Sequence, residues 1–181
     1  MALCEKILIV GFSGAGKSSL VNSLRVHPPE DWELFDDLDD LVLKSRGKGL
    51  KSISQLIEAH GWEQFRLWER QELEGWLKEE GKGVLALGGG ALSPLLLELY
   101  GKSRKIQFCH LEVPFDLAWE RLLGDQQNIR PLTQLGKAHM RELFEQRSQL
   151  FSLIPLKIDG TRSVSLVREE FLKKGCLIEN A

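Results

Sequence analysis

Short apolar runs alternate with longer amphipathic segments along the whole chain. Five runs have the length and the apolar, β-branched content of buried strands, and they cover residues 6–10, 32–35, 84–87, 105–113 and 156–158. Helical spacing of apolar residues recurs at 18–24, 41–46, 52–57, 62–80, 114–123, 137–150 and 163–173, and Ser93-Pro94 begins a further helix. Strands that alternate with helices predict an α/β fold, a three-layer α/β/α sandwich around a five-stranded parallel sheet.

The composition narrows the function classes. A length of 181 residues with 43% hydrophobic content suits one globular domain over residues 1–181. The net charge of −2 argues against a nucleic-acid-binding surface, and no apolar run approaches membrane-spanning length. The first strand follows almost directly on the N-terminus, which leaves no room for a signal peptide, and the three cysteines lack metal-like spacing. We therefore expect a cytoplasmic protein with reduced thiols and no nucleic-acid or membrane partner.

The segment between the first strand and the first helix fits the phosphate-binding pattern G-x-x-x-x-G-K-[ST]. It reads Gly11-Phe12-Ser13-Gly14-Ala15-Gly16-Lys17-Ser18. Its glycines let the backbone curl around an anion, and the helix N-terminus adds partial positive charge. Lys17 can reach the outer phosphates of a nucleoside triphosphate, and the Ser18 hydroxyl can ligate Mg²⁺. The candidate nucleotide-binding residues here are Gly14, Ala15, Gly16, Lys17, Ser18 and Ser19.

An acidic cluster, Asp36-Asp37-Leu38-Asp39-Asp40, ends the second strand. Ligands bind at the carboxyl ends of strands in parallel sheets, so we expect Ser13, Asp37 and Gly88 to converge in space. Carboxylates at that edge can hold Mg²⁺ or its waters, or accept a proton from an attacking hydroxyl. Aspartates also cap helices, and part of the cluster fits that structural role. If the backbone stays extended here, Asp37 and Asp39 both face the site while Leu38 enters the core.

Two further patterns allow a functional and a structural interpretation. In Phe65-Arg66-x-x-Glu69, the arginine and the glutamate are helical neighbours that can pair, either as an ordinary surface ion pair or as part of a site. Gly88-Gly89-Gly90 follows a buried strand, where three glycines permit either close approach to a ligand or a tight turn.

Three arginines surround a polar loop at residues 124–136. Arg130 lies in the loop, while Arg121 and Arg147 lie on the helices before and after it. An arginine on a loop over a phosphate site can stabilise the charge in transit, although each of the three also fits a solvated surface position. The loop is polar and bounded by glycines, so we expect a mobile lid.

Together these motifs resemble those of the shikimate kinase family, from Ile7 to about Gly160. The phosphate loop is shared by many families. The combination of Asp37-Leu38-Asp39, Phe65-Arg66-x-x-Glu69, Gly88-Gly89-Gly90 and Arg130-Pro131-Leu132, in this order and spacing, is far more specific.

The resemblance implies a P-loop kinase that transfers the γ-phosphate of ATP to the 3-hydroxyl of shikimate, within aromatic amino acid biosynthesis. It places shikimate in a helical region at about residues 38–66. By the resemblance, the substrate-binding residues would be Asp39, Arg66, Gly88, Gly89, Gly90 and Arg147.

The resemblance also assigns the nucleotide and metal contacts. Arg130 would close over the phosphates, Arg121 would lie against the adenine, and Ser18 and Asp37 would hold Mg²⁺. The catalytic residues would be Lys17, Asp39 and Arg130. An enzyme of this kind is expected to act as a monomer on small molecules.

The chain departs from the family pattern at three places. Phe151 stands where the family often has tyrosine, Lys48-Gly49-Leu50-Lys51 resembles a small insertion, and the lid between Arg121 and Arg130 is slightly lengthened. The alternatives to a shikimate kinase are another small-molecule kinase of the same fold, such as a gluconate kinase, or a nucleotide-binding module that has lost catalysis. The intact Lys17 and Ser18 speak against the module.

Overall fold

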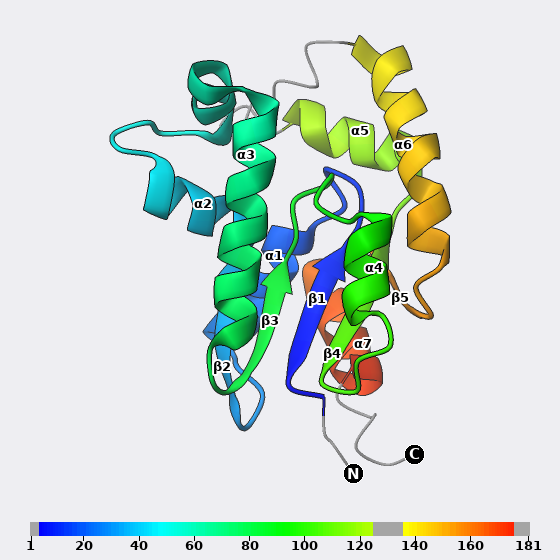
Figure 1. The fold of residues 1–181 in the computed structure, drawn as a ribbon. Coiled ribbons are helices and arrows are strands. Elements are labelled where there is room, and N and C mark those ends of the chain that lie inside the picture. The colour runs from blue at the N-terminus through cyan, green and yellow to red at the C-terminus, as the bar shows by residue number, and fades with distance from the viewer. Residues whose placement is uncertain (1–3, 125–135, 176–181) are drawn as a thin grey trace.

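The computed structural model describes residues 4–124 and 136–175, and Figure 1 shows its arrangement. Its strands form one five-stranded sheet in the order β2-β3-β1-β4-β5, and every neighbouring pair is parallel. This confirms the predicted sheet. The strands are β1 (Lys6–Val10), β2 (Trp32–Asp37), β3 (Lys82–Ala86), β4 (Ile106–Glu112) and β5 (Leu156–Asp159).

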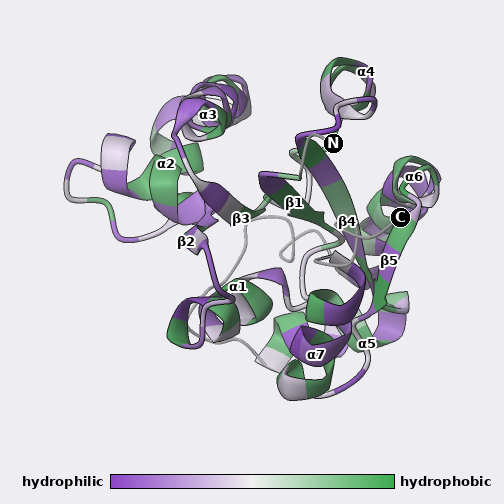
Figure 2. Cartoon of the chain, turned by 90° about the horizontal axis from the view of Figure 1, so that it is seen from below, coloured by the Kyte–Doolittle hydropathy of each residue, from purple (hydrophilic) through white to green (hydrophobic). Residues whose placement is uncertain are grey.

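Helices cover both faces of the sheet, which makes three layers (Figures 1 and 2). Helices α1 and α7 lie on one face, and α3, α4 and α6 lie on the other. The helices are α1 (Lys17–Val26), α2 (Leu38–Arg46), α3 (Ile53–Lys78), α4 (Pro94–Tyr100), α5 (Phe115–Gly124), α6 (Gly136–Ser152) and α7 (Val164–Gly175).

The central strands are apolar because both of their faces are covered. All five residues of β1 are buried, and Ile7, Leu8 and Ile9 have no exposed surface. Strands buried on both sides read as continuous apolar runs rather than as alternating ones, and Figure 2 shows this hydrophobic centre between the helices. The register also aligns the carboxyl ends of β2, β3 and β1, because Ala86 pairs with Asp37 on one side and with Ile9 on the other. Loops that leave these strands therefore meet at one edge of the sheet.

The junction of β2 and α2 differs from its prediction. The strand runs on to Asp37, and the helix begins at Leu38 rather than at Leu41. Asp37 is the N-cap, and its Oδ1 accepts a hydrogen bond of 2.9 Å from the backbone N–H of Asp39. The backbone therefore does not stay extended across residues 37–39, because the chain enters a helix directly after the capping carboxylate. Leu38 is fully buried, as expected.

Helix α3 contains a break at the expected position. Ser52 caps its N-terminus by accepting a hydrogen bond of 3.2 Å from the Gln55 N–H. Gly61 has φ 80° and ψ 165°, so the segment consists of two helical pieces that meet at this glycine. The first piece packs with α2 around a small apolar cluster of Val42, Leu56, Ile57 and Phe65, separate from the main core. The sheet edge and this cluster together frame the candidate site. Among the described helices, none is long and apolar enough to cross a membrane.

Candidate active site

The phosphate loop joins β1 to α1 and has the conformation that its glycines require. Gly14 and Gly16 have φ of 82° and 97°, and Gly16 is the N-cap of α1. A Cβ atom on Gly14 would collide with the carbonyl oxygen of Ala118 in α5. The side chain of Lys17 is buried beneath the loop, where its Nζ donates hydrogen bonds of 2.9 Å to the carbonyls of Gly11 and Phe12. The left-handed glycines and the two lysine hydrogen bonds thus define the conformation of the loop.

Ser18, in the first turn of α1, lies beside Asp37, the N-cap of α2. Ser18 Oγ donates a hydrogen bond of 2.5 Å to Asp37 Oδ2. A hydroxyl and a carboxylate side by side are hard oxygen ligands, and Mg²⁺ is usually held by one or two such groups together with phosphates and waters. No group of three or more metal-ligating side chains occurs in the described parts of the chain. The pair therefore fits a metal that a nucleotide helps to bind.

The acidic cluster divides its side chains between two sides of the sheet edge. Asp37, Asp39 and Asp40 line the cavity described below, and burial together with the charge of Asp37 raises the pKa of Asp40. Asp36 instead accepts a hydrogen bond of 2.9 Å from the indole N–H of Trp76 on α3. Asp36 therefore serves the packing of α3, whereas the other three line the cavity.

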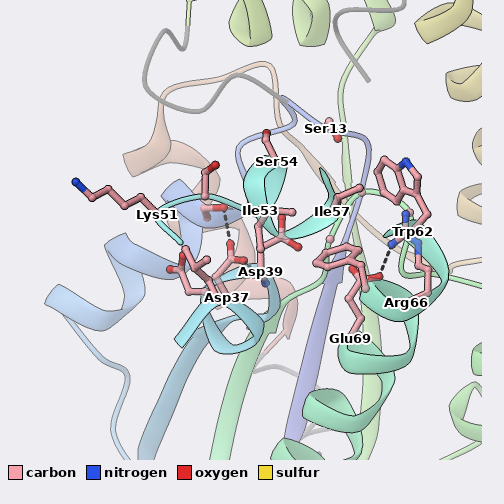
Figure 3. Close-up of a pocket in the computed structure, with 18 of the residues that line it drawn as sticks. Ser13, Asp37, Asp39, Lys51, Ile53, Ser54, Ile57, Trp62, Arg66 and Glu69 are labelled. Atoms are coloured by element: carbon pink, nitrogen blue, oxygen red, sulfur yellow. Dashed lines mark hydrogen bonds and ion pairs between the residues drawn. The ribbon is translucent and has the colours of Figure 1, made fainter. Parts of the chain in front are cut away.

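Arg66 and Glu69 form an ion pair on the second piece of α3. Glu69 is only 3% exposed, and burial raises its pKa to about 7 although Arg66 opposes the shift. The Arg66 guanidinium also lies 5.3 Å from the ring centre of Trp62, which fixes its plane further (Figure 3). The pair is therefore no ordinary surface pair: a buried carboxylate holds a half-buried guanidinium at the wall of a cavity.

A second guanidinium reaches the same place from α6. Arg147 lies 5.6 Å from the ring centre of Phe12 in the phosphate loop, and burial and the charge of Arg66 lower its pKa to about 10. A Cβ atom on Gly90 would lie 2.5 Å from Arg66 Nη2 and 2.8 Å from Arg147 Nη2. Two like charges that converge on one glycine form a site for an anion, and the planar fork of arginine suits a carboxylate.

The other two glycines of the run make similarly close contacts. A Cβ atom on Gly88 would lie 2.7 Å from Glu69 Oε1 and 2.9 Å from Asp39 Oδ1, and one on Gly89 would lie 2.6 Å from Ser13 Oγ. The tight-turn interpretation is therefore insufficient, because each glycine makes room for a polar side chain of the site.

These groups surround one cavity of about 310 Å³ at the carboxyl edge of the sheet. It is large enough for a small polar metabolite. The expected convergence of Ser13, Asp37 and Gly88 is confirmed, since all three line it. Eight of the candidate site residues line it, namely Ser18, Asp37, Asp39, Arg66, Gly88, Gly89, Gly90 and Arg147.

The remaining candidates lie elsewhere. Arg121 does not line the cavity, and its Nη1 donates hydrogen bonds to the carbonyls of Gly160 (2.9 Å) and Ala15 (3.4 Å), on the outer side of the phosphate loop. Gly14, Ala15, Gly16, Lys17 and Ser19 form the loop and the start of α1 beside the cavity. Arg130 and residues 125–135 of the expected lid lie outside the described residues.

The cavity includes residues that sequence reasoning did not select. Helical spacing predicts Glu69 only as a partner of Arg66, although the apolar residues on the same helix face indicate burial. Ile57, Trp62 and Lys51 also line the cavity. Lys51 belongs to the segment that resembles an insertion, and Figure 3 shows it extending away from the other labelled side chains. Asp40 also lines the cavity, although it is not among the candidate site residues. Its position one helical turn after Asp37 was the signal for a shared face.

Comparisons with known proteins agree on one family. The family model for shikimate kinase matches residues 13–174. A shikimate kinase of Lactococcus lactis subsp. cremoris is 33% identical over 171 residues, which cover 93% of this chain and 96% of that protein. The structure of a shikimate kinase from Acinetobacter baumannii in complex with shikimate superposes with a TM-score of 0.77 at 26% identity, covering 97% of this chain and 93% of that one.

A likeness of fold extends beyond this family. A gluconokinase from Sinorhizobium meliloti covers 99% of this chain and 97% of its own, with a TM-score of 0.58 at 16% identity, which shows a shared fold alone. The family model and the 33% identity along most of the sequence are more specific, and by them the chain belongs to the shikimate kinase family.

Proposed function

We infer that this protein is an ATP-dependent kinase that phosphorylates the 3-hydroxyl of shikimate and gives shikimate 3-phosphate and ADP. The observation that carries this inference is the cavity in which the phosphate loop faces two converging guanidinium groups. The phosphate loop can hold a nucleoside triphosphate, and the guanidinium groups can hold a small carboxylic acid. Family membership supplies the identity of that acid and its place in aromatic amino acid biosynthesis.

The phosphoryl donor belongs on the loop. Residues 14–19 present backbone N–H groups and the N-terminus of α1 to the phosphates, and Lys17 supplies the positive charge. The arrangement fits Arg121 near the nucleotide base, beyond the loop. We assign Arg130 to the transferring phosphoryl group from the family resemblance.

The metal ion belongs between Ser18 and Asp37. The hydrogen bond that joins them supports this assignment, because it places two oxygen ligands side by side. When bound, Mg²⁺ neutralises phosphate charge and orients the β- and γ-phosphates. Ser18 is the direct ligand in this proposal, and Asp37 holds the metal through water.

The acceptor belongs between α2, α3 and α6. Arg66 and Arg147 grip its carboxylate, while Gly88, Gly89 and Gly90 leave space for its ring. Asp39 then lies near a ring hydroxyl, orients it and accepts its proton as the new P–O bond forms. Since phosphoryl transfer depends mainly on positioning and charge neutralisation, these contacts account for the chemistry.

We also propose that the protein acts as a monomer in the cytoplasm. Cys109 is a free, buried thiol, which suits a reducing compartment. Sedimentation equilibrium of the purified protein tests the monomer, and a concentration-dependent dimer contradicts it.

The function is tested by ATP consumption with shikimate as acceptor. Wild-type protein should release ADP in proportion to shikimate and only in the presence of Mg²⁺. Lys17→Met should lower kcat by two or more orders of magnitude and keep the fold, because the ammonium stabilises charge that grows during transfer (about 10²-fold or more for one such group). Folded protein that binds ATP without making shikimate 3-phosphate would sink the assignment.

A further inference from the structure

One residue of the phosphate loop faces the acceptor side without a structural partner. Ser13 is 4% exposed, yet it lines the cavity together with Asp39, Arg66 and Arg147. Figure 3 shows it on the phosphate-loop side, above Asp39 and Arg66 in that view. The other loop residue that lines the cavity is Ser18, whose hydroxyl is bonded to Asp37. Ser13 thus lies at the boundary between the donor and acceptor sites.

The Ser13 hydroxyl has neighbours on one side but no hydrogen-bond partner among the described residues. Within residues 4–124 and 136–175 it makes no hydrogen bond. Gly89 closes one side, since a Cβ atom there would lie 2.6 Å from Ser13 Oγ and 3.0 Å from its backbone nitrogen. The open direction is the cavity. A ligand in the cavity that accepts a hydrogen bond can therefore reach this hydroxyl.

We propose that Ser13 Oγ donates a hydrogen bond to an equatorial oxygen of the phosphoryl group as it passes from ATP to the acceptor, and to the same group in the product. The P–O bond to ADP breaks as the bond to the acceptor oxygen forms, the proton of the acceptor hydroxyl passes to Asp39, and Ser13 keeps its own proton. The equatorial oxygens carry the charge of the transition state, so this contact strengthens during transfer. The inference rests on the proposed function.

The test is the kinetics of Ser13→Ala with shikimate and ATP. Loss of a donor aimed at developing charge should lower kcat about tenfold or more, while both KM values stay within about twofold. Ser13→Cys has a similar side-chain volume but a weaker hydrogen-bond donor, so its kcat should lie between those of wild type and Ser13→Ala. Ser165→Ala, an exposed serine on α7, is the matched control and should behave as wild type.

Product binding provides a second readout. Calorimetry should show that Ser13→Ala weakens binding of shikimate 3-phosphate about tenfold while it leaves shikimate binding unchanged. An unchanged kcat, or a raised KM for shikimate alone, overturns the proposal. If wild-type protein makes no shikimate 3-phosphate, the proposed function has failed. If it does and Ser13→Ala matches it, only this inference has failed.

Discussion

At the residue scale, Gly90 holds open the space in which two guanidinium groups meet. Gly90→Ala should push Arg66 and Arg147 apart, because the added Cβ would lie within 2.8 Å of both. The fold should survive, since the clash is with the flexible ends of side chains. We expect KM for shikimate to rise about tenfold to a hundredfold, as for hydrogen bonds to a charged group worth about 1.5–3 kcal/mol. Gly75→Ala, at a helical glycine with open space around it, should leave KM unchanged. Equal KM values for shikimate in the two variants would contradict the assignment of Arg66 and Arg147 as an anion site.

The charge on Glu69 should lower the stability of the fold but support activity. Its pKa in the folded protein is about 7, above its ordinary value of 4.5. The folded protein therefore holds a proton that the unfolded chain has released, so this contribution to stability is complete below about pH 4.5 and is lost as the pH rises through 7. Glu69→Gln cannot titrate, so the variant should not lose this stability as the pH rises. The melting temperature of the variant relative to wild type should increase between pH 5 and pH 8.

The same substitution should weaken catalysis. A neutral amide cannot replace the charged partner of Arg66, so kcat/KM for shikimate should fall about tenfold at pH 8. Thermal unfolding across the pH range and steady-state kinetics measure the two effects. A melting-temperature difference that is independent of pH would show that Glu69 does not titrate in this range.

Asp37 and Asp39 should separate metal binding from acceptor chemistry. Asp39→Asn should keep ATP affinity and lower kcat by about 10²–10⁴, the range for loss of a positioned proton acceptor. Asp37→Asn should instead raise the Mg²⁺ concentration needed for half-maximal rate about tenfold. Asp36→Asn is the control, because its amide oxygen can still accept the Trp76 N–H. Equal Mg²⁺ dependence in the Asp37 and Asp39 variants would overturn this division.

At the element scale, α3 depends on two glycines with opposite roles. Gly61 has a φ of 80° and a ψ of 165°, a conformation that costs other residues about 1–3 kcal/mol, so Gly61→Ala should lower the free energy of unfolding by that amount. Gly75 is helical, and Gly75→Ala should raise the free energy of unfolding by about 0.5–1 kcal/mol. Urea unfolding of the two variants measures both. A stabilising Gly61→Ala would mean that α3 is continuous in solution.

The sequence was a good guide wherever local chemistry decides the element. Apolar runs predicted the five parallel strands, and Ser52, Gly61 and Ser93 marked helix starts and the break in α3. It misplaced the start of α2, because periodicity becomes visible only at Leu41 whereas the Asp37 cap begins the helix three residues earlier, at Leu38. Spacing could place Arg66 and Glu69 on one face, but it could not show that Gly88 and Gly90 press against them. Those contacts join segments far apart in the chain and exist only after folding.

At the scale of the whole molecule, two apolar clusters support the two halves of the site. The sheet core holds the phosphate loop, while the cluster of Val42, Leu56, Ile57 and Phe65 holds the acceptor side of the cavity. The register of β1, β3 and β2 joins them at one edge. The fold alone is shared with a gluconokinase, so the choice of acceptor has to come from the cavity.

The most direct test of that choice is a competition assay. Shikimate, gluconate and a nucleoside monophosphate are mixed at equal, limiting concentrations with ATP, Mg²⁺ and wild-type protein, and the phosphorylated products are identified by mass spectrometry. We expect shikimate 3-phosphate to form while the other two acceptors remain unphosphorylated. Faster phosphorylation of gluconate or of the nucleotide, or ATP turnover with no phosphorylated acceptor, would contradict it.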